Sequence, residues 1–439
     1  MITMICERGA LLFMTAMAAG FTGSCQYARA QDAPSAELIA RGAYLARAAD
    51  CAGCHTALPR KGQPQPRPFA GGLPMGSPFG TIWSSNITPD KEHGIGGYSY
   101  EDFARVLHRG VAPGDKHLYP AMPYPSFSKI NDEDTRALYA YFMHGVEPVN
   151  QSPPETKLPF PFNQRWALRL WRAALAPKDR FAPRPGRDAD WNRGAYLVQS
   201  LGHCGSCHTP RGMGYQERGY DETSEKFLSG GINDNWFAPS LRADPGSGLG
   251  RVTADGLAAF IKTGHGAGIV AYGSMVETIE DSLQYLTDDD LRAVAVYLKS
   301  LPATGAADGI FDPALAQPGR FKSRAPDIAP AQGAAVYARF CAQCHRDDGK
   351  GVPNAFPALA GNPSVISEDT TSLIRLLVEG GNSPATIHGP PRQAMPPFAA
   401  RLTDVQIAQV LTYVRASWGN DARPITTNDV ASMRSKLHK

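Results

Sequence analysis

Three segments of the chain show the apolar spacing of an amphipathic helix, and each begins behind a residue that suits a helix N-cap. In the second and third segments the apolar positions are Leu291, Val294 and Leu298, then Ile407, Val410, Leu411 and Val414. The cap candidates, each followed three residues later by Asp or Gln, are Asn131 with Asp134, Thr287 with Asp290, and Thr403 with Gln406. A tyrosine stands ten residues after each cap, at Tyr141, Tyr297 and Tyr413. We therefore predict three helices that pack alike, each crossing an earlier helix.

A second pattern is repeated ahead of these helices. RGAYLARAADCAGCHT at 41–56 is similar to RGAYLVQSLGHCGSCHT at 193–209, allowing one inserted residue, and QGAAVYARFCAQCH at 332–345 keeps the glycine and an aromatic. The two patterns together divide the chain into three blocks, predicted at residues 31–147, 191–301 and 331–420. Proline-rich connections separate the blocks at 148–190 and 302–330, and a polar tail follows at 421–439.

The N-terminus has the pattern of an export signal. Arg8 precedes the apolar run ALLFMTAMAAGF, which is too short to span a bilayer, and YARA offers a cleavage site after Ala30. Lipidation at Cys25 is the alternative, although TGSC lacks the usual large aliphatic residue. No later window offers 18 consecutive apolar residues, so we predict no transmembrane helix. We expect residues 1–30 to be removed and the mature chain to be periplasmic, at the periplasmic face of the inner membrane.

Composition excludes some classes of protein. Hydrophobic residues make up 43% of the 439 residues and charged residues 19%, which is enough apolar material for packed cores. The net charge is +3 and no long basic stripe occurs, so a nucleic-acid partner is not expected. Of eight cysteines, Cys6 and Cys25 would leave with the signal, and every other cysteine belongs to a CxxCH motif. None is left over for a structural disulfide.

The three CxxCH motifs admit three kinds of chemistry: a redox disulfide, part of a zinc site, or haem attachment. A thioredoxin-like CxxC does not require a histidine directly after the second cysteine, and here all three copies have one. A structural zinc site uses four ligands, and three separated CxxC pairs do not divide neatly into such sites. Haem c uses both thiols for thioether bonds and the histidine as an iron ligand. The sequence therefore favours haem attachment at Cys51 and Cys54, Cys204 and Cys207, and Cys341 and Cys344, with His55, His208 and His345 as ligands.

Each block also holds a methionine at an equivalent place. Met122 follows His55 by 67 residues, Met275 follows His208 by 67, and Met395 follows His345 by 50. Thioether sulfur suits the second axial position of an electron-transfer haem iron. The alternative is that each is a core residue, the usual role of methionine. Because the predicted capped helix follows all three, we predict that they are axial ligands.

Each block resembles a class I cytochrome c domain, and the whole chain resembles the triple-haem cytochrome c subunit of membrane-associated bacterial dehydrogenases that oxidise alcohol, gluconate, sorbitol or fructose. The most specific stretch is GTIWSSNITPDKEHGIGGYSYEDFARVLHRGV at 80–111, followed by LYPAMPYPSF and ALYAYFMHGVEPV. In the third block, GKGVPNAFPALAGNP is similar to the family's proline loop, with Pro357 a candidate to support the histidine side. The resemblance implies an all-α fold of three tandem class I cytochrome c domains joined by proline-rich linkers.

The resemblance also implies a function. A separate catalytic subunit, dependent on PQQ or FAD, would oxidise the substrate, and three haem c groups here would pass electrons to ubiquinone or a terminal oxidase. The chain itself would convert no substrate. Some family members end in a hydrophobic or amphipathic tail, whereas this tail is polar, so membrane contact is expected to be peripheral or through partners. Two alternatives remain: a free-standing periplasmic shuttle, and a multihaem peroxidase, which would need an iron with an open position.

The connection at 148–190 contains RWALRLWRAALA at 165–176, where Trp166, Leu170 and Trp171 alternate with arginines. This segment is either a short helix buried between two blocks or a surface that docks a partner or a membrane. Burial is the more common outcome for an apolar helix face.

Overall fold

The computed structural model describes residues 33–59, 64–305, 308–315 and 330–437. Its contacts divide the chain into Met1–Ser35 and Ala36–Lys439. Of the first unit only residues 33–35 are described, and they form neither helix nor strand. The predicted export signal at 1–30, with Cys6 and Cys25, therefore lies outside the described residues. Within the described ranges, no helix combines the length and the apolar character that crossing a bilayer requires.

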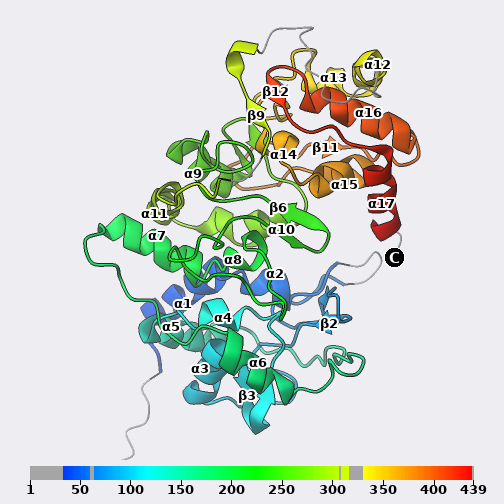
Figure 1. Cartoon of the computed structure of the whole chain (residues 1–439). Coiled ribbons are helices and arrows are strands. Elements are labelled where there is room, and N and C mark those ends of the chain that lie inside the picture. Colours follow the sequence, from blue (N-terminus) through cyan, green and yellow to red (C-terminus); the bar gives the residue numbers. More distant parts are fainter. Residues whose placement is uncertain (1–32, 60–63, 306–307, 316–329, 438–439) are drawn as a thin grey trace, which may run out of the picture. The chain divides into compact units, whose positions relative to one another are not determined.

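The described elements of Ala36–Lys439 are mainly helices, with short strands in two-stranded antiparallel ladders (Figure 1). The first block contains α1 (Ala36–Ala48), α2 (Cys51–His55), β1 (Pro74–Met75), β2 (Ile82–Trp83), α3 (Tyr100–Arg109), β3 (Val111–Ala112), η1 (Pro113–Asp115), β4 (Lys116–His117), α4 (Tyr124–Phe127) and α5 (Asp132–His144). Helix α6 (Ala167–Leu175) follows, and the second block contains α7 (Ala189–Gln199), α8 (Gly205–His208), β5 (Gly231–Asn233), β6 (Trp236–Ala238), α9 (Ala254–Thr263), β7 (His265–Gly266), β8 (Ile269–Val270), α10 (Ser274–Asp281), η2 (Leu283–Tyr285) and α11 (Asp288–Lys299). After β9 (Ile310–Phe311) and η3 (Pro313–Leu315), the third contains α12 (Pro330–Phe340), α13 (Ala342–His345), α14 (Pro363–Ile366), α15 (Thr371–Glu379), β10 (Gly381–Asn382), β11 (Ala394–Met395), α16 (Asp404–Arg415), β12 (Asn420–Asp421) and α17 (Thr427–Leu437).

The three predicted helix starts are confirmed. The Asn131 side chain accepts a hydrogen bond from the Asp134 amide (2.7 Å) at the start of α5, and Thr287 accepts from the Asp290 amide (3.2 Å) at the start of α11. At α16, Thr403 and Gln406 form both halves of a capping box. Each side chain satisfies a backbone N–H that has no partner within the helix, which is why these residues fix where the helices begin.

The predicted crossing of helices is confirmed as well. Helix α1 packs against α5, α7 against α11, and α12 against α16. At each crossing a glycine of the first helix lies on the second: a Cβ at Gly42 would stand 1.9 Å from the Ala137 carbonyl oxygen, and one at Gly194 would stand 1.9 Å from that of Ala293. Gly333 is in the same position, 2.4 Å from the Gln409 oxygen. The three tyrosines flank these contacts, so the repeated glycine and tyrosine mark one backbone-to-backbone crossing.

The cores of the first two blocks are continuous, whereas the third block has a core of its own. One cluster of buried apolar side chains runs from Leu45 and Leu138 to Trp191 and Leu298, and a second cluster lies wholly within the third block. The connection after the first block lies along that block: Asn86 donates to the carbonyl oxygens of Val149 (2.8 Å) and Gln151 (3.0 Å). Of the second connection, residues 306–307 and 316–329 lie outside the described ranges.

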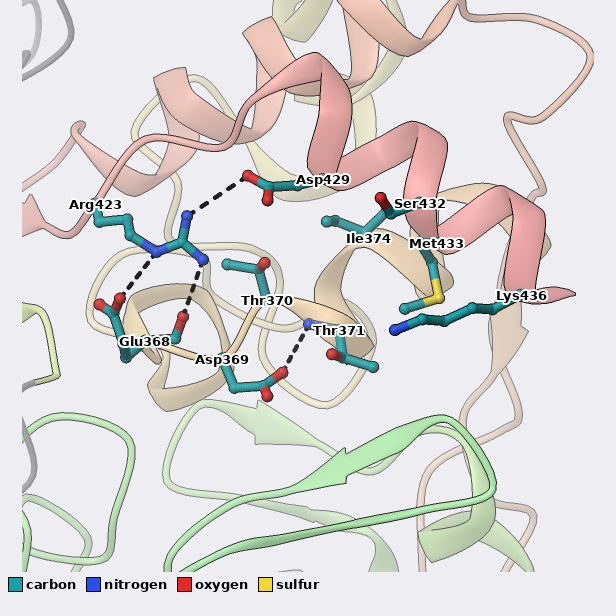
Figure 2. A pocket seen from close by; sticks show the side chains of 10 residues that line it. All are labelled: Glu368, Asp369, Thr370, Thr371, Ile374, Arg423, Asp429, Ser432, Met433 and Lys436. Atoms are coloured by element: carbon teal, nitrogen blue, oxygen red, sulfur yellow. Dashed lines mark hydrogen bonds and ion pairs between the residues drawn. The ribbon is translucent and has the colours of Figure 1, made fainter. Parts of the chain in front are cut away.

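The C-terminal segment, predicted as a polar tail, contributes a helix to the third block. Helix α17 packs against α15 and α16, and its Val430 and Met433 are buried. Ahead of it, Arg423 lies between the carboxylates of Glu368 (2.9 Å) and Asp429 (3.5 Å), in a polar pocket that contains no candidate haem residue (Figure 2). This helix was not predicted because the segment is mostly polar and α17 itself buries only two side chains.

Helix α6 has one face that is buried between the first two blocks and another that is exposed, so each interpretation of its segment holds for one face. The Trp171 indole N–H donates to the Gly214 carbonyl oxygen (2.6 Å), and its ring meets Tyr124 edge-on at 6.3 Å. On the other face Trp166 is 65% exposed and Leu170 is 63% exposed. One side of the helix therefore joins the blocks, and the other presents apolar side chains to the surface.

Candidate haem-binding sites

Each CxxCH motif forms a short helix of its own that follows a longer one: α2 follows α1, α8 follows α7 and α13 follows α12. The six cysteines of the described chain are free and half-buried. Burial raises the pKa of the Cys54 and Cys204 thiols to about 12 and that of Cys341 to about 11. Reactive cysteines of redox CxxC motifs have a lowered pKa instead, so these thiols lack the thiolate character of a disulfide oxidoreductase. Nor do three Cys, His, Asp or Glu side chains of the described residues converge as metal ligands.

The three motif histidines share one hydrogen-bonding arrangement. Nδ1 of His55 lies 2.7 Å from the Ser85 carbonyl oxygen, Nδ1 of His208 lies 2.7 Å from that of Pro239, and Nδ1 of His345 lies 3.0 Å from that of Pro357. Because a carbonyl can only accept, Nδ1 carries the proton and Nε2 keeps its lone pair for a metal. Burial lowers the pKa of all three imidazoles, which favours the neutral form that a ligand must have.

The supporting role expected of Pro357 is confirmed, but the sequence analysis missed Ser85 and Pro239. A signal was available for Pro239, because it is followed two residues later by Leu241 as Pro357 is by Leu359. Ser85 offers no such signal, since it acts through a backbone carbonyl that every residue possesses.

The third block places its predicted ligands around one cavity. Cys341, Cys344, His345 and Met395 all line it, and its volume is about 720 Å³ including the open mouth. The remaining walls are mainly apolar and come from two blocks: Phe340, Phe356, Pro357 and Phe398 of the third, and Val270, Ala271 and Tyr272 of the second. Two thiols, an imidazole with a free Nε2 and a thioether around an apolar space fit haem c.

The other two methionines occupy comparable positions. Met122 is half-buried in a turn where its amide donates to the Tyr119 carbonyl (3.2 Å), and it packs against the core cluster that Cys51 also contacts. Met275 is the second residue of α10 and is half-buried. Their pairing with His55 and His208 rests on the equal spacing in sequence.

Comparisons with known proteins agree with this geometry. The cytochrome c family model matches residues 39–145 and 330–418. The chain is 46% identical to the cytochrome c subunit of a quinone alcohol dehydrogenase from Gluconacetobacter polyoxogenes, over 96% of this chain and 90% of that protein. It is 45% identical to the gluconate 2-dehydrogenase cytochrome c subunit of Pantoea cypripedii, over 93% and 92% of the two chains. The fructose dehydrogenase cytochrome subunit of Gluconobacter japonicus is 38% identical, over 90% and 82%.

The chain belongs to the family of dehydrogenase cytochrome c subunits. The cofactor that this family membership indicates is haem c, and the resemblance inferred from the sequence motifs is confirmed.

The first and second candidate sites of this cytochrome subunit lie close together. Helix α10 of the second block packs against α2 of the first, and the Cys207 thiol adds to the raised pKa of Cys54. The ring of His203, next to Cys204, meets Phe127 of the first block edge-on at 5.6 Å. Asp50, beside Cys51, is crowded by Asp281 and Glu277 of the second block, and burial followed by these charges raises its pKa to about 8. The first and second candidate sites therefore face each other across the block boundary.

One buried acid near the second site was missed by the sequence analysis. Glu217 is 5% exposed, and its Oε1 accepts a hydrogen bond from Ser206 (3.2 Å), inside the CxxCH motif. Its other oxygen, Oε2, has no hydrogen-bond partner, and burial raises the pKa of this carboxyl to about 7. Nothing in the sequence distinguishes Glu217 from a surface glutamate, because only the packing around it removes water.

Proposed function

We propose that this chain is the electron-transfer subunit of a dehydrogenase complex and that it carries three covalently attached haems c. The observation that carries the proposal is the cavity of the third block, where both cysteines, His345 and Met395 face one apolar space. Relatives named as cytochrome subunits of alcohol, gluconate and fructose dehydrogenases support the assignment to a complex.

Each block supplies the same set of groups. The proposed sets are Cys51, Cys54, His55 and Met122; Cys204, Cys207, His208 and Met275; and Cys341, Cys344, His345 and Met395. The thiols would form the thioether bonds of haem c, and Nε2 of the histidine and the methionine sulfur would be the iron ligands; a methionine ligand raises the reduction potential relative to a second histidine. The carbonyls of Ser85, Pro239 and Pro357 hold the imidazoles in the required tautomer. When bound, each haem takes up and releases one electron.

The proposed electron donor is a catalytic dehydrogenase subunit that uses PQQ or FAD, and the proposed acceptor is ubiquinone or a terminal oxidase. We place the complex at the periplasmic face of the inner membrane. The exposed face of α6 supports peripheral contact with the bilayer, because Trp166 and Leu170 stand beside Arg169 on a helix without acidic residues. Aromatic and basic side chains on one helix are typical of segments that lie in the membrane interface.

The axial assignment is tested by spectroscopy of single variants. Met122→Ala, Met275→Ala and Met395→Ala are each expected to remove one third of the far-red absorption that arises from the methionine–iron bond, while Soret absorption shows that haem remains. Met213→Ala is the matched control, because Met213 is fully exposed. If the three variants keep the band that the control keeps, the methionines are not ligands. The count is tested by haem analysis, which should fall from three to two per chain in Cys204→Ala/Cys207→Ala.

The assignment to a complex is tested by co-purification. Gently solubilised membranes of the source cells should yield this chain together with a larger subunit, and an alcohol, sugar or sugar acid should reduce its haems. A chain that runs alone, and whose haems no such substrate reduces in crude extract, would contradict the role in a dehydrogenase.

A further inference from the structure

The first and second blocks exchange hydrogen bonds through their repeated RGAYL motifs. The Tyr196 hydroxyl of the second block donates to Oδ2 of Asp134 in the first block (2.6 Å). In the opposite direction, the Tyr44 hydroxyl of the first block donates to Oδ2 of Asp290 in the second. Asp134 and Asp290 occupy equivalent positions, three residues after the N-caps of α5 and α11. We call these two reciprocal contacts the tyrosine clasp.

The carboxylate that accepts each tyrosine hydrogen bond is also bound by an arginine of its own block. Arg41 donates to Oδ1 of Asp134 through Nε (3.0 Å) and Nη2 (2.6 Å), and Arg193 donates to Asp290 through Nε (2.7 Å) and Nη2 (2.8 Å). Asp134 is only 1% exposed. The arginines neutralise carboxylates that burial would otherwise disfavour, and each tyrosine then adds a charge-assisted hydrogen bond from the other block.

The reciprocal contacts relate the two blocks by an approximate two-fold symmetry, and this symmetry extends beyond the tyrosine clasp. Arg47 stands three residues after Tyr44, and its guanidinium lies 4.4 Å from the ring centre of Tyr285, two residues before the cap of α11. In the other half, Gln199 stands three residues after Tyr196 and accepts from Nζ of Lys129 (2.9 Å), two residues before the cap of α5. Together with the continuous apolar core, these contacts make the first two blocks one paired structure.

The third block lacks the residues that make the clasp. Gln332 stands where the other motifs have arginine, Ala335 where they have tyrosine, and Gln406 where they have the capping aspartate. The crossing of α12 and α16 is nevertheless the same as in the other blocks. The clasp residues are therefore not needed to build a block, and they occur only where two blocks pair.

We propose that Tyr44 and Tyr196 are positioning residues that hold the first and second haem sites at a fixed separation, so that an electron passes between these two sites as within one rigid pair. The proposal rests on the proposed function for its electron-transfer consequence, although the clasp itself rests on the contacts above. With haem bound at both sites, the ferrous iron of one would be oxidised as the ferric iron of the other is reduced, and no further reactant would be needed. The contact of α2 with α10, which carries Met275, and the contact of Phe127 with His203, beside Cys204, place both candidate sites at the clasped boundary.

The clasp is tested with spin labels on the full haem-loaded chain. All six mature cysteines lie in the CxxCH motifs, so labels can be attached at Glu101→Cys in α3 and Asp255→Cys in α9, which are both exposed. Pulsed dipolar spectroscopy then reports the distance between the first and second blocks. Removing one hydrogen bond to a charged group at each tyrosine should raise the population of separated blocks by roughly tenfold or more per site. We therefore expect a narrow distance distribution to broaden in Tyr44→Phe/Tyr196→Phe.

Tyr337→Phe is the matched control, because its hydroxyl donates to the Arg346 carbonyl oxygen (2.6 Å) inside the third block. It should leave the distance distribution narrow. A distribution that stays narrow in the double variant, or that broadens equally in the control, would overturn the clasp. The second measurement is the rate of electron exchange between the first two haems after a light pulse, which should fall in the double variant while the haem spectra stay unchanged. An unchanged rate with separated blocks would overturn the positioning role and leave the proposed dehydrogenase function standing.

Discussion

Replacing Gly194 by alanine places a methyl group where two helices meet backbone to backbone. The new Cβ would stand 1.9 Å from the Ala293 carbonyl oxygen and 2.8 Å from Cβ of Tyr297. Carbon and oxygen normally approach to ~3.3 Å, so α7 and α11 must part by about 1.4 Å. No rotamer change can relieve this contact, because the opposing atoms belong to the backbone or to a Cβ.

The size of the effect follows from two opposing terms. Overpacking costs up to about 3 kcal/mol, and the higher helix propensity of alanine returns about 1 kcal/mol. The net loss of about 2 kcal/mol should lower the melting temperature of the paired first and second blocks by roughly 4–8 °C. The same substitution at Gly42 should cost as much, since its closest contact is also 1.9 Å, whereas Gly333 at 2.4 Å should cost less.

The assay is thermal unfolding of the haem-loaded chain followed by Soret circular dichroism. Gly97→Ala is the control, because a Cβ at Gly97 meets nothing within 4 Å. If Gly194→Ala melts together with this control at the wild-type temperature, the helices are not held in backbone contact and the reasoning fails. A cost at Gly333 larger than at Gly194 would refute the argument from distance.

Three further results are expected. Burial raises the pKa of Glu217 from 4.5 to about 7, so the stability contributed by its protonated carboxyl is complete below pH 4.5 and is lost as the pH rises through 7. In urea unfolding, wild type should lose roughly 3 kcal/mol of stability relative to Glu217→Gln over this pH window. Parallel pH profiles of the two proteins would contradict the burial argument. Ending the chain at Ile425 removes two buried apolar side chains of α17, so urea unfolding should show the third block destabilised by about 3–5 kcal/mol. An unchanged urea unfolding midpoint would show that α17 adds nothing to the core. Trp166→Ser/Leu170→Ser should weaken binding to vesicles of anionic phospholipid in a sedimentation assay without changing the melting temperature. Equal binding by wild type and the double variant would exclude the exposed face of α6 as the membrane contact.

Local signals in the sequence predicted much of the fold. The caps at Asn131, Thr287 and Thr403 were identified because a capping side chain acts on an amide only two or three residues away. The repeated glycine and tyrosine predicted the helix crossings, because a close contact between two helices requires the same residue types in every copy. The buried face of α17 was not predicted, and for α6 the sequence left burial and an exposed docking face as alternatives, because amphipathic spacing shows that a helix has two faces but not what covers them.

The sequence by itself determined the chemistry that the chain can hold: spacing along a few residues is sufficient to place two thiols and an imidazole together, and three copies favoured haem attachment over a disulfide or a zinc site. Only the tertiary structure decided which carbonyls orient His55 and His208, that Cys341, His345 and Met395 share one cavity, and that Tyr44 and Tyr196 reach the carboxylates of each other's blocks. The physical reason is the range of the interactions. A backbone carbonyl is the same on every residue, and a tyrosine–aspartate hydrogen bond spanning 246 residues is specified by how two cores pack, which no local pattern records.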